Sequence, residues 1–261
     1  MLGGAFRQLR VAAALLLFAG ASHGQAPVEA RYLTPTAYSE QDSSAVWRSL
    51  GTSYVRKALK EDTLDRDPAW NARLDTAMAA IGAAAARLYP PFAATRWSAL
   101  LIEDFGHGAV AFPGGTVLVD SRFARQLALT DNELALILAH EVAHLVAGHP
   151  SEKLSFMAVK LGKERAPTAG SALLAFYTQD AFARLFQPTA MLQEREADAI
   201  GARILRASGF DALQALALFD KLAKIEPAGN GISSHDPALV RKESARRILE
   251  LPAFPGPHAA E

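Results

Sequence analysis

The segment Leu136–Pro150 reads LILAHEVAHLVAGHP and holds three histidines and one glutamate in an otherwise almost wholly apolar run. On an α-helix, residues four apart lie on one face, so His140 and His144 are placed to share one metal ion. Glu141 lies about 100° round the helix from His140, where it can reach a water molecule on that ion without binding the ion itself. This HExxH spacing predicts metal-assisted hydrolysis with Glu141 as the general base.

The flanks of this stretch are those of a buried helix. Thr130, followed three residues later by Glu133, forms a capping box that predicts the helix start, and Gly148 and Pro150 predict its end. Between these limits the helix is apolar on most of its sides. Polar side chains inside such a helix need partners, so a metal site is favoured over two histidines placed by chance on a surface.

A third histidine, His149, comes close to the HExxHxxGxxH pattern of three-histidine sites but misses its spacing. That pattern needs glycine seven and histidine ten residues after the first histidine, whereas Gly148 and His149 stand at eight and nine. On a continued helix His149 would point roughly opposite to His140. We therefore expect His149 to end the helix and to interact with the negative end of its dipole or with a neighbour.

The remaining ligand is expected downstream, and two glutamates compete for it. The chain has no cysteine, so a metal here takes nitrogen and oxygen ligands. Glu164 lies twenty residues after the second histidine of HExxH, but Pro167 interrupts any helix there. In QEREADAIG, Glu194 and Asp198 are four apart, so one helix face can offer Glu194 to the metal and Asp198 to a ligating imidazole. We favour Glu194, and we interpret Glu196 as a solvated acid.

Composition and the N-terminus bear on partners and location. The 261 residues are half hydrophobic, with 27 basic and 27 acidic side chains, which suits one globular domain and gives no argument for a nucleic-acid or anionic-membrane partner. Arg7 and Arg10 precede an apolar run over 11–19 and then small residues. This pattern predicts a cleavable signal peptide over 1–24 and a periplasmic mature chain. The run is about half of the roughly 20 residues that a membrane span needs.

The whole pattern predicts an α+β fold that is mainly α-helical, with a small β-sheet beside the HExxH helix. Helical spacing occurs over 43–60, over 68–88 after Asp67 as N-cap, and, beyond Pro188, over 190–207 and 211–225. Short β-prone runs over 97–102 and 116–119 flank a turn-rich FPGG. After the signal peptide we expect an N-terminal helical segment (25–66), a metallopeptidase domain (67–250) and a loose C-terminal tail (251–261).

Several motifs in order carry a family resemblance. They are GAVAFPGG at 108–115, the helix TDNELALILAHEVAHLVAGH, EREAD at 194–198 and SSHDP at 233–237. Over about 67–248 the chain resembles the zinc metallopeptidases that include the HtpX heat-shock protease, the CAAX prenyl protease and the periplasmic proteases BepA and LoiP. Two positions depart from the family pattern, because Gly108 stands where asparagine is usual and Asp236 is inserted before the proline.

The resemblance implies a compact gluzincin domain with one zinc ion on His140, His144 and Glu194, with Glu141 as general base and acid. Asp198 would orient a ligand, and Arg241 would help the oxyanion. For His235 it implies one of two roles, either a fourth ligand that blocks the metal or a stabiliser of the tetrahedral intermediate. A strand would pair with extended substrate through Gly108, Ala109, Val110, Ala111 and Phe112.

Two functions are carried forward. The first is an exported zinc-dependent metalloendopeptidase that hydrolyses misfolded or unassembled envelope proteins. The second is a latent chaperone or assembly factor with envelope-assembly partners, in which His235 caps the zinc. The intact Glu141 favours catalysis, because a pure binder needs no general base. A membrane-embedded protease like the prenyl relatives is disfavoured, because no long uncharged apolar span follows residue 26.

Overall fold

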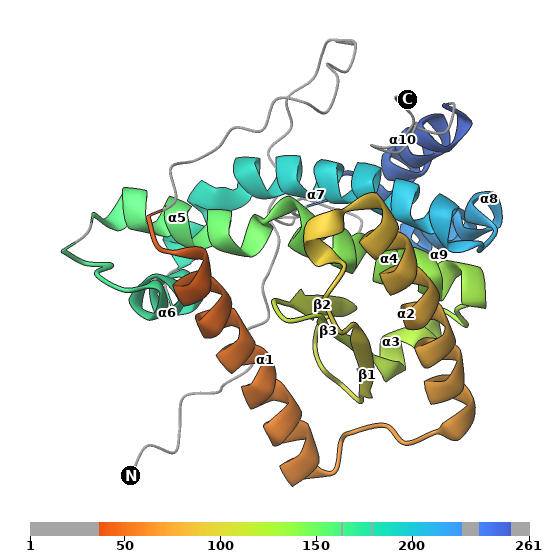
Figure 1. The fold of residues 1–261 in the computed structure, drawn as a ribbon, viewed down its shortest axis with the longest axis horizontal. Coiled ribbons are helices and arrows are strands. Elements are labelled where there is room, and N and C mark those ends of the chain that lie inside the picture. The colour runs from red at the N-terminus through yellow and green to blue at the C-terminus, as the bar shows by residue number, and fades with distance from the viewer. Residues whose placement is uncertain (1–36, 163, 179, 226–234, 252–261) are drawn as a thin grey trace.

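The computed structural model describes residues 37–162, 164–178, 180–225 and 235–251. The predicted signal peptide (1–24) and nearly all of the predicted tail (251–261) lie outside this part of the chain. The described part is mainly helical with one small sheet, which confirms the predicted fold class (Figure 1). Its helices are α1 (Glu40–Glu61), α2 (Pro68–Leu88), η1 (Pro90–Phe92), α3 (Ser121–Gln126), α4 (Asp131–Ala147), α5 (His149–Leu161), α6 (Ala169–Thr178), α7 (Asp180–Ser208), α8 (Ala212–Ala215), α9 (Ala217–Ile225) and α10 (Ala238–Glu250). Its strands are β1 (Ser98–Ile102), β2 (Ala109–Phe112) and β3 (Thr116–Asp120).

The sheet has the order β1-β3-β2, with β1 parallel and β2 antiparallel to β3. Successive side chains along a strand point to opposite faces, and here both faces are covered. Alternate residues such as Leu101, Val117 and Val119 pack into one core with α2, α4 and α7. Leu118 and Phe112 pack into a second core with α1, α5 and α6. The sheet therefore separates two apolar cores, and β2 lies at its edge.

The HExxH helix, α4, is the most enclosed element around the site. Thr130 and Glu133 form the predicted capping box at its start, with both reciprocal hydrogen bonds present. Leu134, Leu138 and Val142 are fully buried along its length. The helix ends where Gly148 adopts a left-handed conformation with φ 78°. Polar groups on α4 are thus held at defined positions by packing on nearly every side.

Helix α7 packs against α4 (Figure 1). A Cβ atom placed on Gly201 would lie 3.1 Å from both Cα and N of His140. Only a residue without a side chain fits there, because both of those neighbours are backbone atoms. Gly201 therefore allows α7 to lie close enough for its carboxylates to reach the histidines of α4.

Two expectations about helix boundaries were wrong. The helix expected to begin after Pro188 begins at Asp180 and contains this proline. Proline has no N–H to donate, so the carbonyl of Arg184, four residues earlier, lacks its helical partner. Both residues are exposed, and water can therefore bond to that carbonyl. Pro150, expected to end α4, instead lies in the first turn of α5, where proline is well tolerated.

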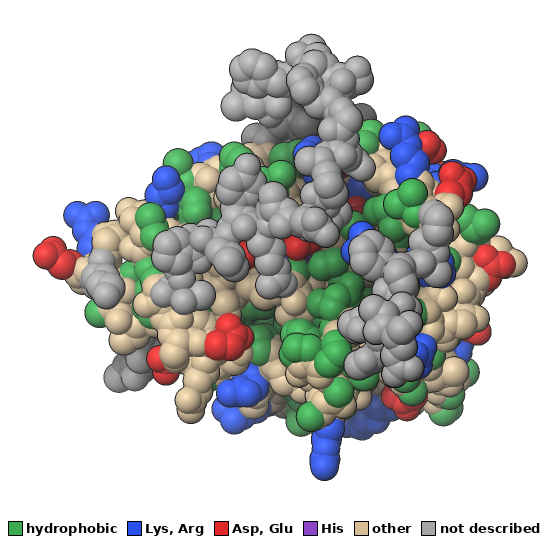
Figure 2. Space-filling view, turned by 45° about the horizontal axis from the view of Figure 1, so that its top comes forward, with side chains coloured by type: hydrophobic (Ala, Val, Ile, Leu, Met, Phe, Trp, Pro, Cys, Tyr) green, Lys and Arg blue, Asp and Glu red, His purple; other side chains and the backbone are tan. Residues whose placement is uncertain are grey.

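The surface and the helix lengths bear on partners. On the face in Figure 2, acidic and basic side chains are interspersed, with no field of one sign. Among the described residues, no helix combines the length and the apolar character that crossing a bilayer requires.

We predict that Gly201→Ala destabilises the protein by about 1–3 kcal/mol, because the added methyl group forces the backbones of α4 and α7 apart. The matched control is Gly170→Ala, also in a helix, where a Cβ atom meets nothing closer than 3.8 Å. That substitution should be neutral or should stabilise by up to about 1 kcal/mol. Chemical denaturation measures both, and equal effects at the two sites would contradict the close packing at Gly201.

Candidate metal centre

Three side chains from α4 and α7 point their ligand atoms at one another. Nε2 of His140 and Nε2 of His144 are 3.1 Å apart. Oε2 of Glu194 lies 3.1 Å from the first of these nitrogens and 3.5 Å from the second. Ligands about 2.1 Å from a tetrahedral ion stand about 3.4 Å from each other. The three atoms are therefore spaced as ligands of one metal ion.

The oxygen of Glu194 is a direct test of whether a cation fits. This Oε2 atom is buried, and no described residue contacts it in hydrogen-bonding geometry, although three imidazole nitrogens lie within 2.7–3.5 Å. Burial raises the pKa of Glu194, but the neighbouring imidazoles outweigh burial and hold the pKa well below its usual value. A buried, ionised and unsatisfied oxygen is costly. Two imidazole nitrogens and one carboxylate are a ligand set that suits zinc. A bound zinc ion would give the unsatisfied oxygen of Glu194 the partner that it lacks.

The ring of His140 is held from behind by Asp198. Its Nδ1 lies 3.0 Å from Oδ1 of Asp198, which leaves Nε2 directed at Glu194. Burial lowers the pKa of His140, but the two carboxylates more than compensate and raise it to about 10. Arg241 donates to both oxygens of Asp198, at 2.7 and 2.8 Å. Arg241, expected near the oxyanion, is thus placed to fix Asp198, and its oxyanion role stays a prediction.

The ring of His144 is held by a pair that sequence reasoning missed. Its Nδ1 lies 2.8 Å from Nδ1 of His149, and Nε2 of His149 lies 3.2 Å from Oε2 of Glu196. His149 was expected to end the helix and to interact with the negative end of its dipole or with a neighbour, and Glu196 was interpreted as a solvated acid. The left-handed turn at Gly148 redirects the chain, so the 100° per residue used for His149 does not apply beyond it.

Glu141, which follows His140 in α4, reaches the edge strand β2. Its Oε2 accepts a hydrogen bond of 2.9 Å from the backbone N–H of Ala111. Residues along a strand alternate in the direction of their peptide groups, so Ala109 and Ala111 direct theirs to the outer edge. Consistent with this, the carbonyl of Gly108 points inward and accepts from Asp120. The remaining residues of the predicted substrate strand, Val110 and Phe112, direct their peptide groups toward β3.

The two remaining expectations concern a loop histidine and a competing glutamate. Nε2 of His235 lies 2.7 Å from Oε2 of Glu194, and its side chain is 40% exposed. His235 is thus at the site, but it lies outside the compact set formed by His140, His144 and Glu194. Glu164 is exposed and is not part of that set.

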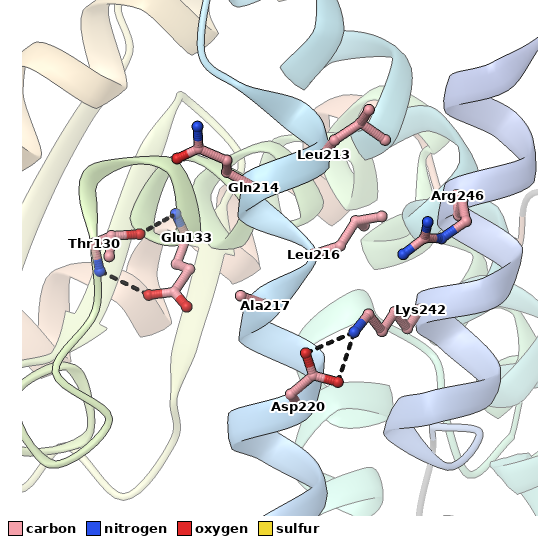
Figure 3. A pocket seen from close by; sticks show the side chains of 9 residues that line it. All are labelled: Thr130, Glu133, Leu213, Gln214, Leu216, Ala217, Asp220, Lys242 and Arg246. Carbon is pink, nitrogen blue, oxygen red and sulfur yellow. Dashed lines mark hydrogen bonds and ion pairs between the residues drawn. The ribbon is translucent and has the colours of Figure 1, made fainter.

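A cavity of about 370 Å³ lies elsewhere, between the start of α4 and α8, α9 and α10 (Figure 3). Three of the charged groups that line it, Glu133, Asp220 and Lys242, have partners. Glu133 bonds to the N–H of Thr130 and to Lys221, and Lys242 pairs with both oxygens of Asp220. None of the predicted site residues lines this cavity, so it is separate from the metal centre.

An HExxH helix, a downstream glutamate with its helix neighbour, and an edge strand define a metallopeptidase type of domain. Comparison with known proteins agrees, because the model of peptidase family M48 matches residues 70–249, more than half of the chain. The chain therefore belongs to peptidase family M48. This confirms the predicted family and, at the level of the family, the prediction of a metal-dependent peptide hydrolase.

Individual relatives are distant and longer. The putative beta-barrel assembly-enhancing protease of Vibrio cholerae is 29% identical over 184 residues, which are 66% of this chain and 37% of the relative. The mitochondrial metalloendopeptidase OMA1 of Saccharomyces cerevisiae is 28% identical over 162 residues, 60% of this chain and 46% of the relative. The beta-barrel assembly-enhancing protease of Yersinia pestis is 30% identical over 177 residues, 62% and 35% respectively. The chain thus spans less than half the length of these relatives.

We predict that Glu194→Ala loses zinc while Glu164→Ala keeps one ion per chain. The first substitution removes an oxygen within 3.5 Å of both histidine nitrogens, and the second changes an exposed side chain. Elemental analysis after dialysis against a weak chelator measures the bound metal. Retention in Glu194→Ala together with loss in Glu164→Ala would transfer the ligand assignment to Glu164.

Proposed function

We propose that the chain is an exported zinc-dependent metalloendopeptidase that hydrolyses peptide bonds of misfolded or unassembled envelope proteins. The observation that carries the proposal is the buried, unsatisfied Oε2 of Glu194 beside the Nε2 atoms of His140 and His144. Glu141 is on the same helix as these two histidines and supplies a further carboxylate. Membership of a peptidase family supports the reaction class.

The proposed roles follow from the positions of the side chains. His140, His144 and Glu194 would hold the zinc ion. The ion would act as a Lewis acid that activates water and polarises the scissile carbonyl. Glu141 would take the proton of the attacking water and deliver it to the leaving amine nitrogen. Because the N–H of Ala111 already binds Oε2 of Glu141, the other oxygen, Oε1, is the one proposed to carry this proton.

The proposed substrate site is the outer edge of β2. The only strand that pairs with β2 in the described part of the chain is β3, on its inner side. Ala109 offers both its N–H and its C=O at the outer edge, and Ala111 offers its C=O, since its N–H is bound to Glu141. An extended peptide pairing there would lie beside Glu141, and such pairing needs an unfolded segment. This requirement favours misfolded or unassembled proteins as substrates.

Location and partners rest on sequence and on the names of relatives. The predicted signal peptide favours export to the periplasm, and two relatives are named for beta-barrel assembly, which favours envelope proteins as substrates or assembly partners. The name of OMA1 places that relative in mitochondria instead. The interspersed charges in Figure 2 give no support to a nucleic-acid partner.

One contact favours the second function, a latent chaperone or assembly factor. Nε2 of His235 lies 2.7 Å from Oε2 of Glu194, where it could cap the metal as a fourth ligand. The alternative role for His235 is to stabilise the tetrahedral intermediate. The variant His235→Ala separates the two, since faster hydrolysis indicates a cap and slower hydrolysis a stabiliser.

We predict that Glu141→Gln lowers the rate of casein hydrolysis by about 10²–10⁴-fold, the usual contribution of a general base. Zinc content should stay at the wild-type level, because Glu141 is not a proposed ligand. Glu164→Gln, which changes an exposed glutamate, is the matched control and should keep the wild-type rate. If the zinc-loaded wild type cleaves unfolded protein no faster than Glu141→Gln, the chain is not an endopeptidase, and the proposal of a latent chaperone or assembly factor is favoured.

A further inference from the structure

We propose that His149 and Glu196 form a positioning relay that sets the tautomer and orientation of His144 as a metal ligand. The relay would do for His144 what Asp198 and Arg241 do for His140. The inference rests on the proposed metal site, which it deepens by assigning roles to two residues behind the ligands.

The contacts of His149 are directed at both ends of its ring. The side chain is 4% exposed, so its two nitrogens have little access to water. Nδ1 lies 2.8 Å from Nδ1 of His144, and Nε2 lies 3.2 Å from Oε2 of Glu196. The rings of His144 and His149 meet edge to face, with centroids 4.9 Å apart. His149 therefore bridges a proposed ligand and a carboxylate of α7.

With metal on Nε2 of His144, the positions of the ring protons of His144 and His149 follow from one another. An imidazole that binds metal through Nε2 carries its proton on Nδ1, so Nδ1 of His144 donates. Nδ1 of His149 then accepts, and its own proton lies on Nε2. That nitrogen faces the carboxylate of Glu196, which accepts. Each donor thus faces an acceptor. Because the carboxylate of Glu196 can only accept, it favours the tautomer of His149 with the proton on Nε2 over the one with the proton on Nδ1.

The fold places the three acidic residues of EREAD on two sides of α7. At about 100° per residue, Glu194 lies about 60° to one side of the fully buried Ala197 and Glu196 about 100° to the other. The left-handed turn at Gly148 brings His149 to the Glu196 side, directly after α4 ends. One short motif therefore supplies a ligand in Glu194, the end of the relay in Glu196, and the partner of His140 in Asp198.

The relay has a consequence for metal binding that packing alone would not have. Without an acceptor at position 149, the proton on Nδ1 of His144 loses its partner. No contact then favours one orientation of the His144 ring, or one of its two tautomers, over the other. Loss of such a partner behind a ligating histidine lowers metal affinity by about 10- to 100-fold. Replacement by a side chain of similar shape that keeps the acceptor should preserve affinity.

The experiment compares two nearly isosteric substitutions in the whole chain, His149→Asn and His149→Leu. The side-chain oxygen of asparagine falls near the position of Nδ1, whereas leucine fills the same space without an acceptor. Zinc affinity is measured by competition with a chromophoric chelator. We expect His149→Asn to stay within about threefold of wild type and His149→Leu to bind about 10- to 100-fold more weakly. Equal affinity of the leucine variant and wild type would overturn the relay.

Two controls keep loss of structure apart from loss of the relay. Leu154→Ala removes a fully buried side chain of the same helix, α5, that makes no contact in the relay. It should lower the melting temperature of the metal-free chain without changing zinc affinity. If His149→Leu is unstable, Glu196→Leu and Glu196→Gln repeat the test, because only glutamine keeps an acceptor for Nε2 of His149. Equal zinc affinities for that pair would also count against the relay.

Nitrogen-15 NMR of the zinc-loaded chain gives a readout that does not depend on activity. The relay predicts that His144 carries its proton on Nδ1 and His149 carries its proton on Nε2. A proton on Nδ1 of His149 would overturn the proposal. If the wild type binds no zinc at all, the proposed function fails. If it binds zinc and His149→Leu binds equally well, the relay alone fails.

Discussion

The site depends on the close approach of α4 and α7, which Gly201 makes possible beside the backbone of His140. Each helix carries only part of the proposed coordination sphere. The histidines lie one turn apart on α4, and Glu194 and Asp198 lie one turn apart on α7. At a wider separation of the two backbones, Glu194 would not reach both Nε2 atoms. The apolar packing of these helices therefore also sets the distances between the proposed ligand atoms.

The same packing removes water from polar groups, and polar contacts behind the proposed ligands take the place of that water. Asp198 contacts both His140 and Arg241, and His149 lies between His144 and Glu196 in the proposed relay. With Nδ1 engaged in both rings, both Nε2 atoms face Glu194. Fixed rings lose less freedom when an ion binds, so the cost of assembling the site is met during folding rather than at binding.

Sequence reasoning succeeded where one regular helix relates the residues concerned. The spacing of four predicted that His140 and His144 lie together, and their Nε2 atoms do. The same spacing in EREAD favoured Glu194 over Glu164, and of these two glutamates Glu194 lies beside the histidines, while its role as a ligand stays a prediction. It predicted the helix end at Gly148 but not the direction of His149, because the left-handed residue breaks the helical count and sends His149 toward His144. A glycine within the helical pattern at 201 was a signal that could have been read as close packing.

Other features were beyond local patterns. Nothing in the spacing relates Ala111 to Glu141 or His235 to Glu194, because these contacts join a strand, a helix and a loop through the tertiary fold. For His235 and the edge strand, only the family resemblance pointed to the site. The resemblance did not point to the contacts of Arg241 with Asp198, and the oxyanion role that it implied for Arg241 stays a prediction.

The most direct test of the central claim is X-ray absorption spectroscopy at the zinc edge of the zinc-loaded chain. The account predicts one zinc ion with two imidazole nitrogens at about 2.0–2.1 Å and carboxylate oxygen at about 2.0–2.2 Å. The imidazole contribution to the spectrum should fall when either His140 or His144 is replaced. A spectrum with oxygen ligands and no imidazole, or one unchanged in those variants, would contradict a metal centre built between α4 and α7.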